Sequence, residues 1–143
     1  MADLDMKVFI GMNRVLKAIT RATDKVHKQY GLTSGQFAVL EVLLSKGPMS
    51  VGQVQNRILT TSGNMPVIVK NLEKRQLITT HPDKHDARKR NLQLTDAGRT
   101  LIAEVFPQNE RVIKEHLAVF SSEEQALMVR CFMRFGGNKW NDL

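Results

Sequence analysis

One stretch of the sequence, residues 60–95 (TTSGNMPVIVKNLEKRQLITTHPDKHDARKRNLQLT), constrains the fold more than any other. It predicts a short helix that ends at about Arg75, followed by a two-stranded β-ribbon. Branched residues favour a strand over residues 77–81, and residues 91–94 alternate polar and apolar side chains. The loop between them, residues 82–90, combines turn-forming Pro and Asp with several Lys and Arg. This order predicts a helix with a charged β-hairpin, a wing, beside it.

Capping patterns divide the flanking sequence into helices. A Ser or Thr three residues before Gln or Glu bonds the free N–H groups of a first helical turn. The pattern occurs three times, at Thr33/Gln36, Ser50/Gln53 and Ser121/Glu124. The helix opened by Ser50 is short and ends in a turn at residues 60–61, so it and the next helix form a helix-turn-helix. In that second helix Met65, Ile68, Val69 and Leu72 are expected to face inward, and Gly63, Asn64, Val67, Lys70, Asn71 and Lys74 outward.

Long helices are expected at both ends of the chain. Apolar residues recur at spacings of three and four over residues 5–30, which is typical of an amphipathic helix. Its apolar stripe is wide enough to suggest packing on another subunit, with an ordinary core helix of a monomer as the alternative. A further helix begins at Thr95 or Asp96, and Pro107 is expected to interrupt it with a kink.

The last helix is expected to bury its apolar side and to stop at Gly136. The residues of that side are Leu127, Met128, Cys131, Phe132 and Phe135. Cys131, the only cysteine, cannot form an internal disulfide, which fits a reducing cytoplasm. We interpret it as a packing residue. The expected fold is mainly α, with about six helices and a small β-hairpin wing in a single domain, residues 1–143.

The positive charge is concentrated in the middle of the chain. The net charge is +7, and residues 46–100, with ten basic and four acidic groups, carry +6 of it. This distribution predicts that the middle third meets a polyanion; a solvated basic face without a partner is the alternative. No apolar run reaches the roughly 18 residues of a membrane span. The amino terminus has no signal-peptide pattern, so we expect a cytoplasmic protein without a membrane partner.

The helix after the turn is a candidate for reading the major groove of double-stranded DNA. Side chains near the amino end of such a helix reach base edges, and Ser62, Asn64 and Val67 have suitable sizes. Lys70 and Lys74 would lie against phosphates. The full set of candidates here is Ser50, Thr61, Ser62, Gly63, Asn64, Pro66, Val67, Lys70 and Lys74. Pro66 predicts an irregular first turn or a helix that starts later than Ser62; a merely solvent-facing helix is the alternative.

The wing carries the second group of candidates. An arginine held out on a hairpin suits a narrow minor groove, where negative potential is focused. Arg88 follows Asp86 by two residues, a spacing that lets the carboxylate orient the guanidinium. Lys84, Lys89 and Arg90 would contact phosphates. The alternative is a charged loop that serves only solubility.

These pieces together resemble the MarR family of bacterial winged-helix regulators. The resemblance rests on residues 32–44, the phrase NLEKRQLI at residues 71–78, the motif Asp86-x-Arg88 and residues 94–98 (LTDAG), and it covers essentially the whole chain. It implies a homodimer in which residues 1–30 and 96–143 supply the dimerisation helices and residues 33–95 the DNA-binding part. It implies binding to a near-palindromic operator, most often as a repressor, and release by a small aromatic or phenolic effector.

Two departures from the family pattern stand out. The family usually has Gly after the recognition helix, where this chain has Gln76, so a left-handed exit is less comfortable. Peroxide-sensing members use a cysteine near the amino terminus, and this chain has none there. Two other classes of protein stay open: a non-specific architectural DNA-binding protein, and a protein–protein adaptor on a winged-helix scaffold.

Other chemistry has little support in the sequence. No His or Cys pair has the spacing of helical zinc ligands, so neither a metal nor a cofactor is expected. The sequence contains neither a phosphate-cradling glycine loop nor a nucleophile elbow, so these motifs give no reason to expect an enzyme. An effector pocket is expected where the first, second and fifth helices meet, lined by Met12, His27, Phe37, Phe106 and Asn109. A buried, satisfied His27 is the more ordinary alternative.

Overall fold

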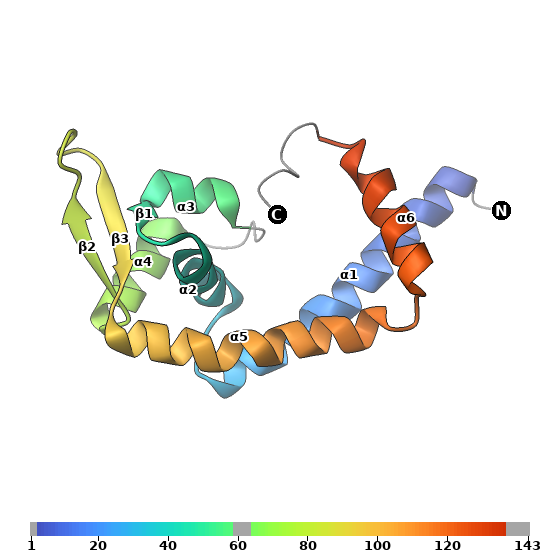
Figure 1. Ribbon diagram of the computed structural model, residues 1–143, viewed down its shortest axis with the longest axis horizontal. Helices are drawn as coiled ribbons and strands as arrows, with labels where there is room; N and C mark the ends of the chain where they lie inside the picture. Colours follow the sequence, from blue (N-terminus) through green and yellow to red (C-terminus); the bar gives the residue numbers. More distant parts are fainter. Residues whose placement is uncertain (1–2, 59–63, 137–143) are drawn as a thin grey trace.

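The computed structural model describes residues 3–58 and 64–136. These residues form six helices and three strands. In chain order they are α1 (Leu4–Gln29), α2 (Ser34–Lys46), β1 (Met49–Ser50), α3 (Val51–Arg57), α4 (Met65–Lys74), β2 (Ile78–Pro82), β3 (Arg90–Leu94), α5 (Asp96–Leu117) and α6 (Ser122–Met133). The molecule is elongated, and α5 runs along most of its length (Figure 1). The sheet with α2, α3 and α4 lies at one end, and α6 with the start of α1 lies at the other.

The small sheet has three strands rather than the predicted two. Its order is β1-β3-β2, and all pairs are antiparallel. The hairpin pairs Ile78 with Leu94 and Pro82 with Arg90, as a wing requires. The extra strand, β1, pairs Met49 with Leu92. A strand of two residues is too short to show the alternation of polar and apolar side chains from which strands are predicted.

The hydrophobic core lies at the winged end of the molecule. Its buried residues run from Val26 to Val105 and include Leu40, Leu72, Leu92 and Ile102, all essentially inaccessible to solvent. They come from the last turns of α1, from α2, α3, α4 and the sheet, and from the first half of α5. This core holds α4 and the wing in a fixed relation to each other.

The opposite end of the molecule buries little of its apolar surface. No residue of α6 is buried, and Leu127 and Phe135 are 53% and 85% exposed. Cys131 is exposed as well. The prediction that α6 buries its apolar side and Cys131 is therefore wrong for the described part of the chain, in which Met128 is half-buried and Cys131 is exposed. The helix also ends at Met133, earlier than the expected Gly136.

Pro107 does not interrupt α5. The helix is continuous from Asp96 to Leu117 with Pro107 inside it (Figure 1), so the predicted interruption is wrong. Proline removes one backbone hydrogen bond to the residue four positions earlier, here Ala103. Both Pro107 and Ala103 are exposed, so solvent can reach the freed carbonyl. The helix also packs against α1 and α2, which support it along its length.

The motif at residues 94–98 joins the sheet to α5. The Thr95 hydroxyl accepts a hydrogen bond from the Gly98 N–H at 3.0 Å and donates one to the Gln76 carbonyl at 2.7 Å. A Cβ at position 98 would lie 1.9 Å from the Leu77 carbonyl oxygen, so only glycine fits. Gln76 has φ of 59°, the left-handed exit that the sequence predicted to be uncomfortable without glycine. The start of α5 is thereby fixed against the strand that follows α4.

Candidate nucleic-acid interface

Helix α4 presents a polar and basic face to solvent. Met65, Ile68, Val69 and Leu72 are buried, as predicted from their spacing. On the other side Asn64, Val67, Lys70, Asn71 and Lys74 are exposed, Val67 by 52%. Val67 is an apolar side chain that lies half exposed on the same face as Lys70 and Lys74. It is suited to contact a methyl group such as that of thymine.

The amino end of α4 begins at Met65, later than Ser62, as Pro66 predicted. Pro66 occupies the first turn, where a missing N–H is harmless because that group has no partner within the helix. Asn64 takes the extended conformation of a cap residue but makes no capping hydrogen bond with its side chain. Thr61, Ser62 and Gly63 lie outside the described residues.

Ser50 serves as a helix cap. Its hydroxyl accepts from the Gln53 N–H at 3.2 Å, and the Gln53 side chain accepts from the Ser50 N–H at 2.9 Å. The predicted capping box is confirmed. A hydroxyl that already serves the backbone has one lone pair and its own proton left for a phosphate.

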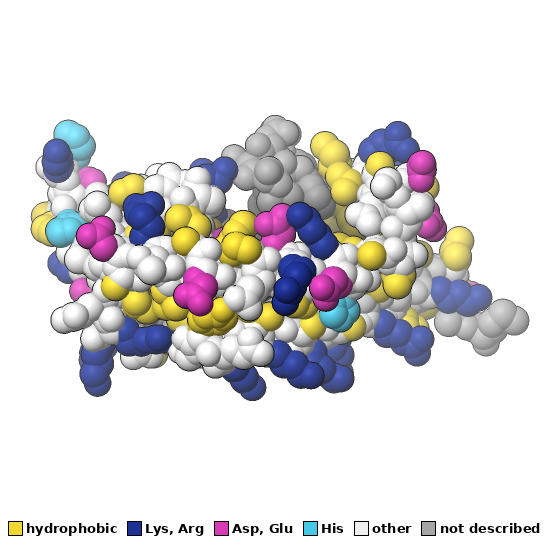
Figure 2. All heavy atoms as spheres, turned by 60° about the horizontal axis from the view of Figure 1, so that its bottom comes forward, with side chains coloured by type: hydrophobic (Ala, Val, Ile, Leu, Met, Phe, Trp, Pro, Cys, Tyr) yellow, Lys and Arg dark blue, Asp and Glu magenta, His cyan; other side chains and the backbone are white. Residues whose placement is uncertain are grey.

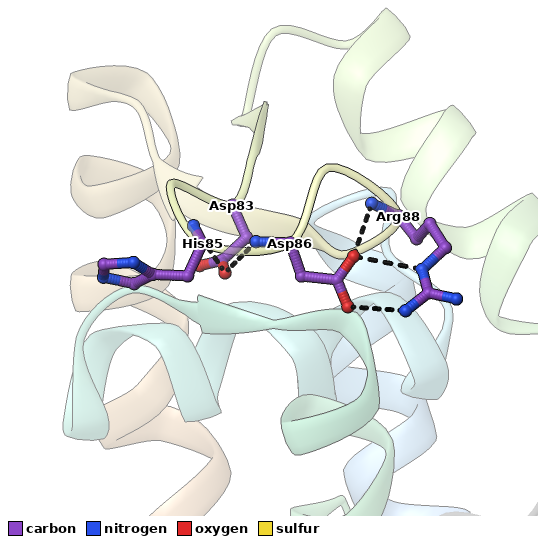
Figure 3. A network of polar contacts seen from close by, with 4 residues as sticks. All are labelled: Asp83, His85, Asp86 and Arg88. Carbon is purple, nitrogen blue, oxygen red and sulfur yellow. Dashed lines mark hydrogen bonds and ion pairs between the residues drawn. The ribbon is translucent and has the colours of Figure 1, made fainter.

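Arg88 projects from the wing and is held by Asp86 (Figure 3). The Asp86 carboxylate accepts from Nε of Arg88 at 3.2 Å and from its backbone N–H at 3.0 Å. The Arg88 side chain is nevertheless 92% exposed, against 31% for Asp86. Hydrogen bonds from Arg88 hold the pKa of Asp86 below its ordinary value, so the carboxylate stays charged. The predicted pairing is confirmed. Asp86 orients the exposed Arg88 guanidinium in the protein alone, without a binding partner.

Asp83 orders the tip of the wing, a role that the sequence analysis missed. Its carboxylate accepts from Nδ2 of Asn91 at 3.1 Å and from the backbone N–H groups of His85 and Asp86 at 3.2 and 3.1 Å. The Asn91 bond is the main reason that the pKa of Asp83 is lowered. Its position directly after Pro82 was the available signal, because Asp at a turn commonly bonds the backbone two residues further on.

The base of the wing is tied to α4 through a short chain of side chains. The Arg90 guanidinium donates to the Thr80 hydroxyl at 2.7 Å, and that hydroxyl donates to the Glu73 carboxylate at 3.0 Å. Arg90 is therefore partly engaged within the protein, whereas Lys84 and Lys89 are exposed and have no ion pair among the described residues. The two candidate DNA-binding elements form one unit, because Glu73 belongs to α4 and Thr80 to β2.

The expected effector residues separate into two places. His27 and Asn109 are buried and hydrogen-bonded to each other at 2.8 Å, and the Phe37 ring stacks on His27 with 4.2 Å between ring centroids. Phe106 packs against the same core. Met12 is exposed and lies 15 residues before His27 on α1, about 22 Å along the helix. The structure thus does not bring Met12 to the junction of α1, α2 and α5.

His27 is well supplied with partners. Its Nδ1 lies 3.0 Å from the Ser34 hydroxyl, which itself donates to the Asp24 carboxylate. Burial lowers the pKa of His27, and the Asn109 bond and the charge of Asp24 oppose that effect.

No group of His, Cys, Asp and Glu in the described part of the chain could hold a metal ion. No helix among those residues is long and apolar enough to cross a membrane.

A buried core that fixes a solvent-facing helix beside an arginine-tipped hairpin defines the class of winged helix-turn-helix DNA-binding proteins. A model of the MarR family matches residues 30–89. The HTH-type transcriptional regulator MhqR of Bacillus subtilis is 31% identical over 138 residues, 96% of this chain and 95% of MhqR. PecS of Dickeya dadantii is 31% identical over 127 residues, 86% of this chain and 76% of PecS. The chain belongs to the MarR family of transcriptional regulators.

Solved structures share the fold. BpsR of Bordetella bronchiseptica aligns with a TM-score of 0.82 at 22% identity, covering 96% of this chain and 99% of BpsR. The organohalide-sensing regulator RdhR aligns at 0.79 and 21%, covering 94% and 80%. BpsR is described as regulated in DNA binding by 6-hydroxynicotinic acid, and RdhR has been solved with bound 2,4-dichlorophenol. At these identities the likeness carries over the fold alone.

Proposed function

We propose that this protein is a homodimeric repressor that binds a near-palindromic operator in a sequence-specific manner. The observation that carries the proposal is the Asp86–Arg88 pair, which holds an exposed guanidinium on a wing coupled to α4. A preset arginine loses less conformational entropy on entering a minor groove than a free one. Val67 on α4 and Asn64 at its N-cap supply side chains that can distinguish base edges in the adjacent major groove.

Dimerisation is supported by the apolar surface at the end of the molecule remote from the wing. Leu4, Phe9 and Leu16 of α1 are 78%, 57% and 65% exposed, and Leu127 of α6 is 53% exposed. A monomeric protein seldom leaves a contiguous apolar patch of this kind in water. A second copy related by two-fold symmetry would cover α1 and α6 and place two α4 helices on one duplex.

An effector is proposed at the junction of α1, α2 and α5. Phe37, His27 and Asn109 provide a ring face and polar groups there, and two relatives of the fold are described with small planar aromatic ligands. A ligand that inserts at this junction would separate α1 from α2 and change the spacing between the two α4 helices. Loss of DNA affinity would follow as a shift in population between two arrangements.

The test is footprinting of the purified protein on the DNA upstream of its own gene, followed by titration of the protected duplex and of a random duplex of equal length. Sequence-specific binding predicts a protected site with two-fold symmetry and a preference of about 10³-fold or more at physiological salt. A preference below about tenfold would instead indicate an architectural DNA-binding protein. No affinity for either duplex would indicate a protein–protein adaptor.

A further inference from the structure

The wing contains a chain of hydrogen bonds that runs from the sheet to Arg88. Asn91 of β3 donates from Nδ2 to one oxygen of the Asp83 carboxylate at 3.1 Å. The other oxygen accepts from the backbone N–H groups of His85 and Asp86 at 3.2 and 3.1 Å. The Asp86 carboxylate accepts in turn from Nε of Arg88 at 3.2 Å. Each residue of this chain thereby fixes the position of the next.

The chain starts from the middle strand of the sheet. β3 lies between β1 and β2, and Asn91 pairs with Ser50 on one side and with His81 on the other. The loop beyond it is closed by a backbone bond of 2.9 Å from the Asp83 N–H to the Lys89 carbonyl. No residue of this loop belongs to the hydrophobic core. Hydrogen bonds, rather than apolar packing, therefore hold the shape of the loop.

The same bonds decide where the side chains of the loop point. Asp83 and Asp86 lie in the middle of the loop, and the side chains of His85 and Arg88 point away from each other on its two sides (Figure 3). The wing projects at one end of the molecule, where Figure 2 shows His beside Lys or Arg. Without the Asp83 carboxylate, the N–H groups of His85 and Asp86 would turn to water. The direction in which Asp86 holds Arg88 would then be lost.

We propose that Asp83 and Asn91 are positioning residues for DNA binding, which act through Asp86 to direct Arg88 into the minor groove. This inference rests on the proposed DNA-binding function. A carboxylate beside a polyanion is unfavourable by its charge, so Asp83 favours binding only through the shape of the loop. A long side chain that is ordered beforehand saves the entropy of ordering it in the complex, which corresponds to about a 2- to 10-fold gain in affinity.

The first measurement follows Arg88 in the protein without DNA. The order parameter of its Nε–H bond, from nitrogen-15 relaxation, separates a rigid group from a flexible one. It should fall in Asp83→Ala and in Asn91→Ala, and both variants should fold, since neither residue belongs to the core. His85→Ala is the matched control, because it changes the side chain that points away from Arg88 and keeps the backbone N–H bonded to Asp83. An order parameter that falls equally in the control, or stays unchanged in either variant, would overturn the proposal.

The second measurement is a double-mutant cycle with Arg88→Ala on the protected operator duplex. Asp83→Ala removes a negative charge, so charge alone predicts tighter binding to DNA. We expect instead a loss of affinity of about 2- to 10-fold. In the Arg88→Ala background the same change should cause no loss, because no guanidinium is left to direct.

Two results of the cycle would overturn the proposal: no loss of affinity in Asp83→Ala, or an equal loss with and without Arg88. A wild-type protein that does not prefer the operator over a random duplex would overturn the proposed function instead. The order parameter of Arg88 is measured without DNA, so it still decides whether Asp83 and Asn91 hold the arginine.

Discussion

His27 of α1 and Asn109 of α5, 82 positions apart in the sequence, are joined by a buried hydrogen bond of 2.8 Å from Nε2 to Oδ1. On the other side of the ring, the Ser34 hydroxyl donates to Asp24 and can therefore only accept from Nδ1. A doubly protonated ring satisfies both neighbours as they are oriented. A neutral ring has one N–H, so one neighbour must reorient: either the Asn109 amide turns and donates to Nε2, or the Ser34 hydroxyl turns and donates to Nδ1. The protonation of His27 is coupled in this way to the junction between α1, α2 and α5.

The stability of the protein should depend on pH through His27. Burial places its pKa in the folded state below the unfolded value of about 6.5. The unfolded chain therefore binds more protons between the two values, and the free energy of unfolding falls as the pH drops below about 6.5. The fall levels off once the pH is below the folded pKa. Chemical denaturation from pH 8 to 5 should show this loss in the wild-type protein and a smaller one in His27→Gln; equal pH dependence of the two would contradict the assignment.

Removal of the wing arginine should weaken operator binding while leaving the fold intact. Arg88→Ala is expected to lower the affinity by about 1–3 kcal/mol, because the exposed guanidinium makes no contact that supports the core. Asp86→Ala leaves the positive charge of Arg88 in place but removes the carboxylate that orients its guanidinium, and should give a smaller loss of affinity. Fluorescence anisotropy on the protected duplex measures both, and the double variant should cost less than the sum of the two single changes. Unchanged affinity in Arg88→Ala would remove the wing from the interface.

Position 98 should tolerate no side chain. In Gly98→Ala the new Cβ would meet the Leu77 carbonyl oxygen at 1.9 Å, so either α5 or the start of β2 must move. We expect a loss of about 1–3 kcal/mol or more in the free energy of unfolding, typical of an overpacked site. Gly52→Ala is the matched control, since the nearest atom to its Cβ, Oγ of Ser50, is 4.0 Å away. That variant should be neutral or stabilised by about 0.5–1 kcal/mol in urea denaturation.

Glycine at position 76 should stabilise the fold. Gln76 has φ of 59° and its side chain is exposed, so the backbone bears the strain of a left-handed residue without a compensating side-chain burial. Gln76→Gly is expected to raise the free energy of unfolding by up to about 1 kcal/mol, after the entropy of glycine in the unfolded chain is subtracted. Gln76→Val, whose branched Cβ is worse at positive φ, should lower it. A stabilising effect of valine would show that the strain is not at this residue.

Charges placed on the apolar end should prevent dimerisation. Leu16→Glu/Leu127→Glu puts carboxylates on side chains that are 65% and 53% exposed in the single chain, so the chain should still fold. Sedimentation equilibrium is expected to give the monomer mass for this variant and the dimer mass for Thr100→Glu, which alters an exposed position of α5 at the winged end. A dimer in both variants would place the interface elsewhere.

Local patterns predicted the parts of the fold that depend on neighbours in sequence. The three capping boxes, at Thr33, Ser50 and Ser121, form as expected because each needs only four consecutive residues. The inward face of α4 and the Asp86–Arg88 pair follow from spacing in the same way. Contacts over long separations left no such signal. The bond from Arg75 to Gly31 and the bond from Arg90 to Thr80 join residues whose types are ordinary at their positions.

The errors have a common physical origin. Strand β1 exists only because β3 lies beside it, and Pro107 is tolerated only because α5 is supported along its length by α1 and α2. Cys131 and the apolar side of α6 were expected to be buried because apolar residues usually are. Their exposure in the single chain shows that hydrophobic spacing alone does not predict burial within the same chain.

The uneven distribution of the core has a consequence for the order of folding and assembly. Among residues 3–58 and 64–136, every buried apolar residue lies between Val26 and Val105, so the winged end can consolidate in a step that involves one chain. In the proposed dimer the α6 end would gain further apolar contacts on encounter with a second chain, a step whose rate rises with concentration. At low concentration we expect newly made chains to pass through a species with a formed winged end and an open α6 end. Such a species would be the natural target of chaperones and proteases.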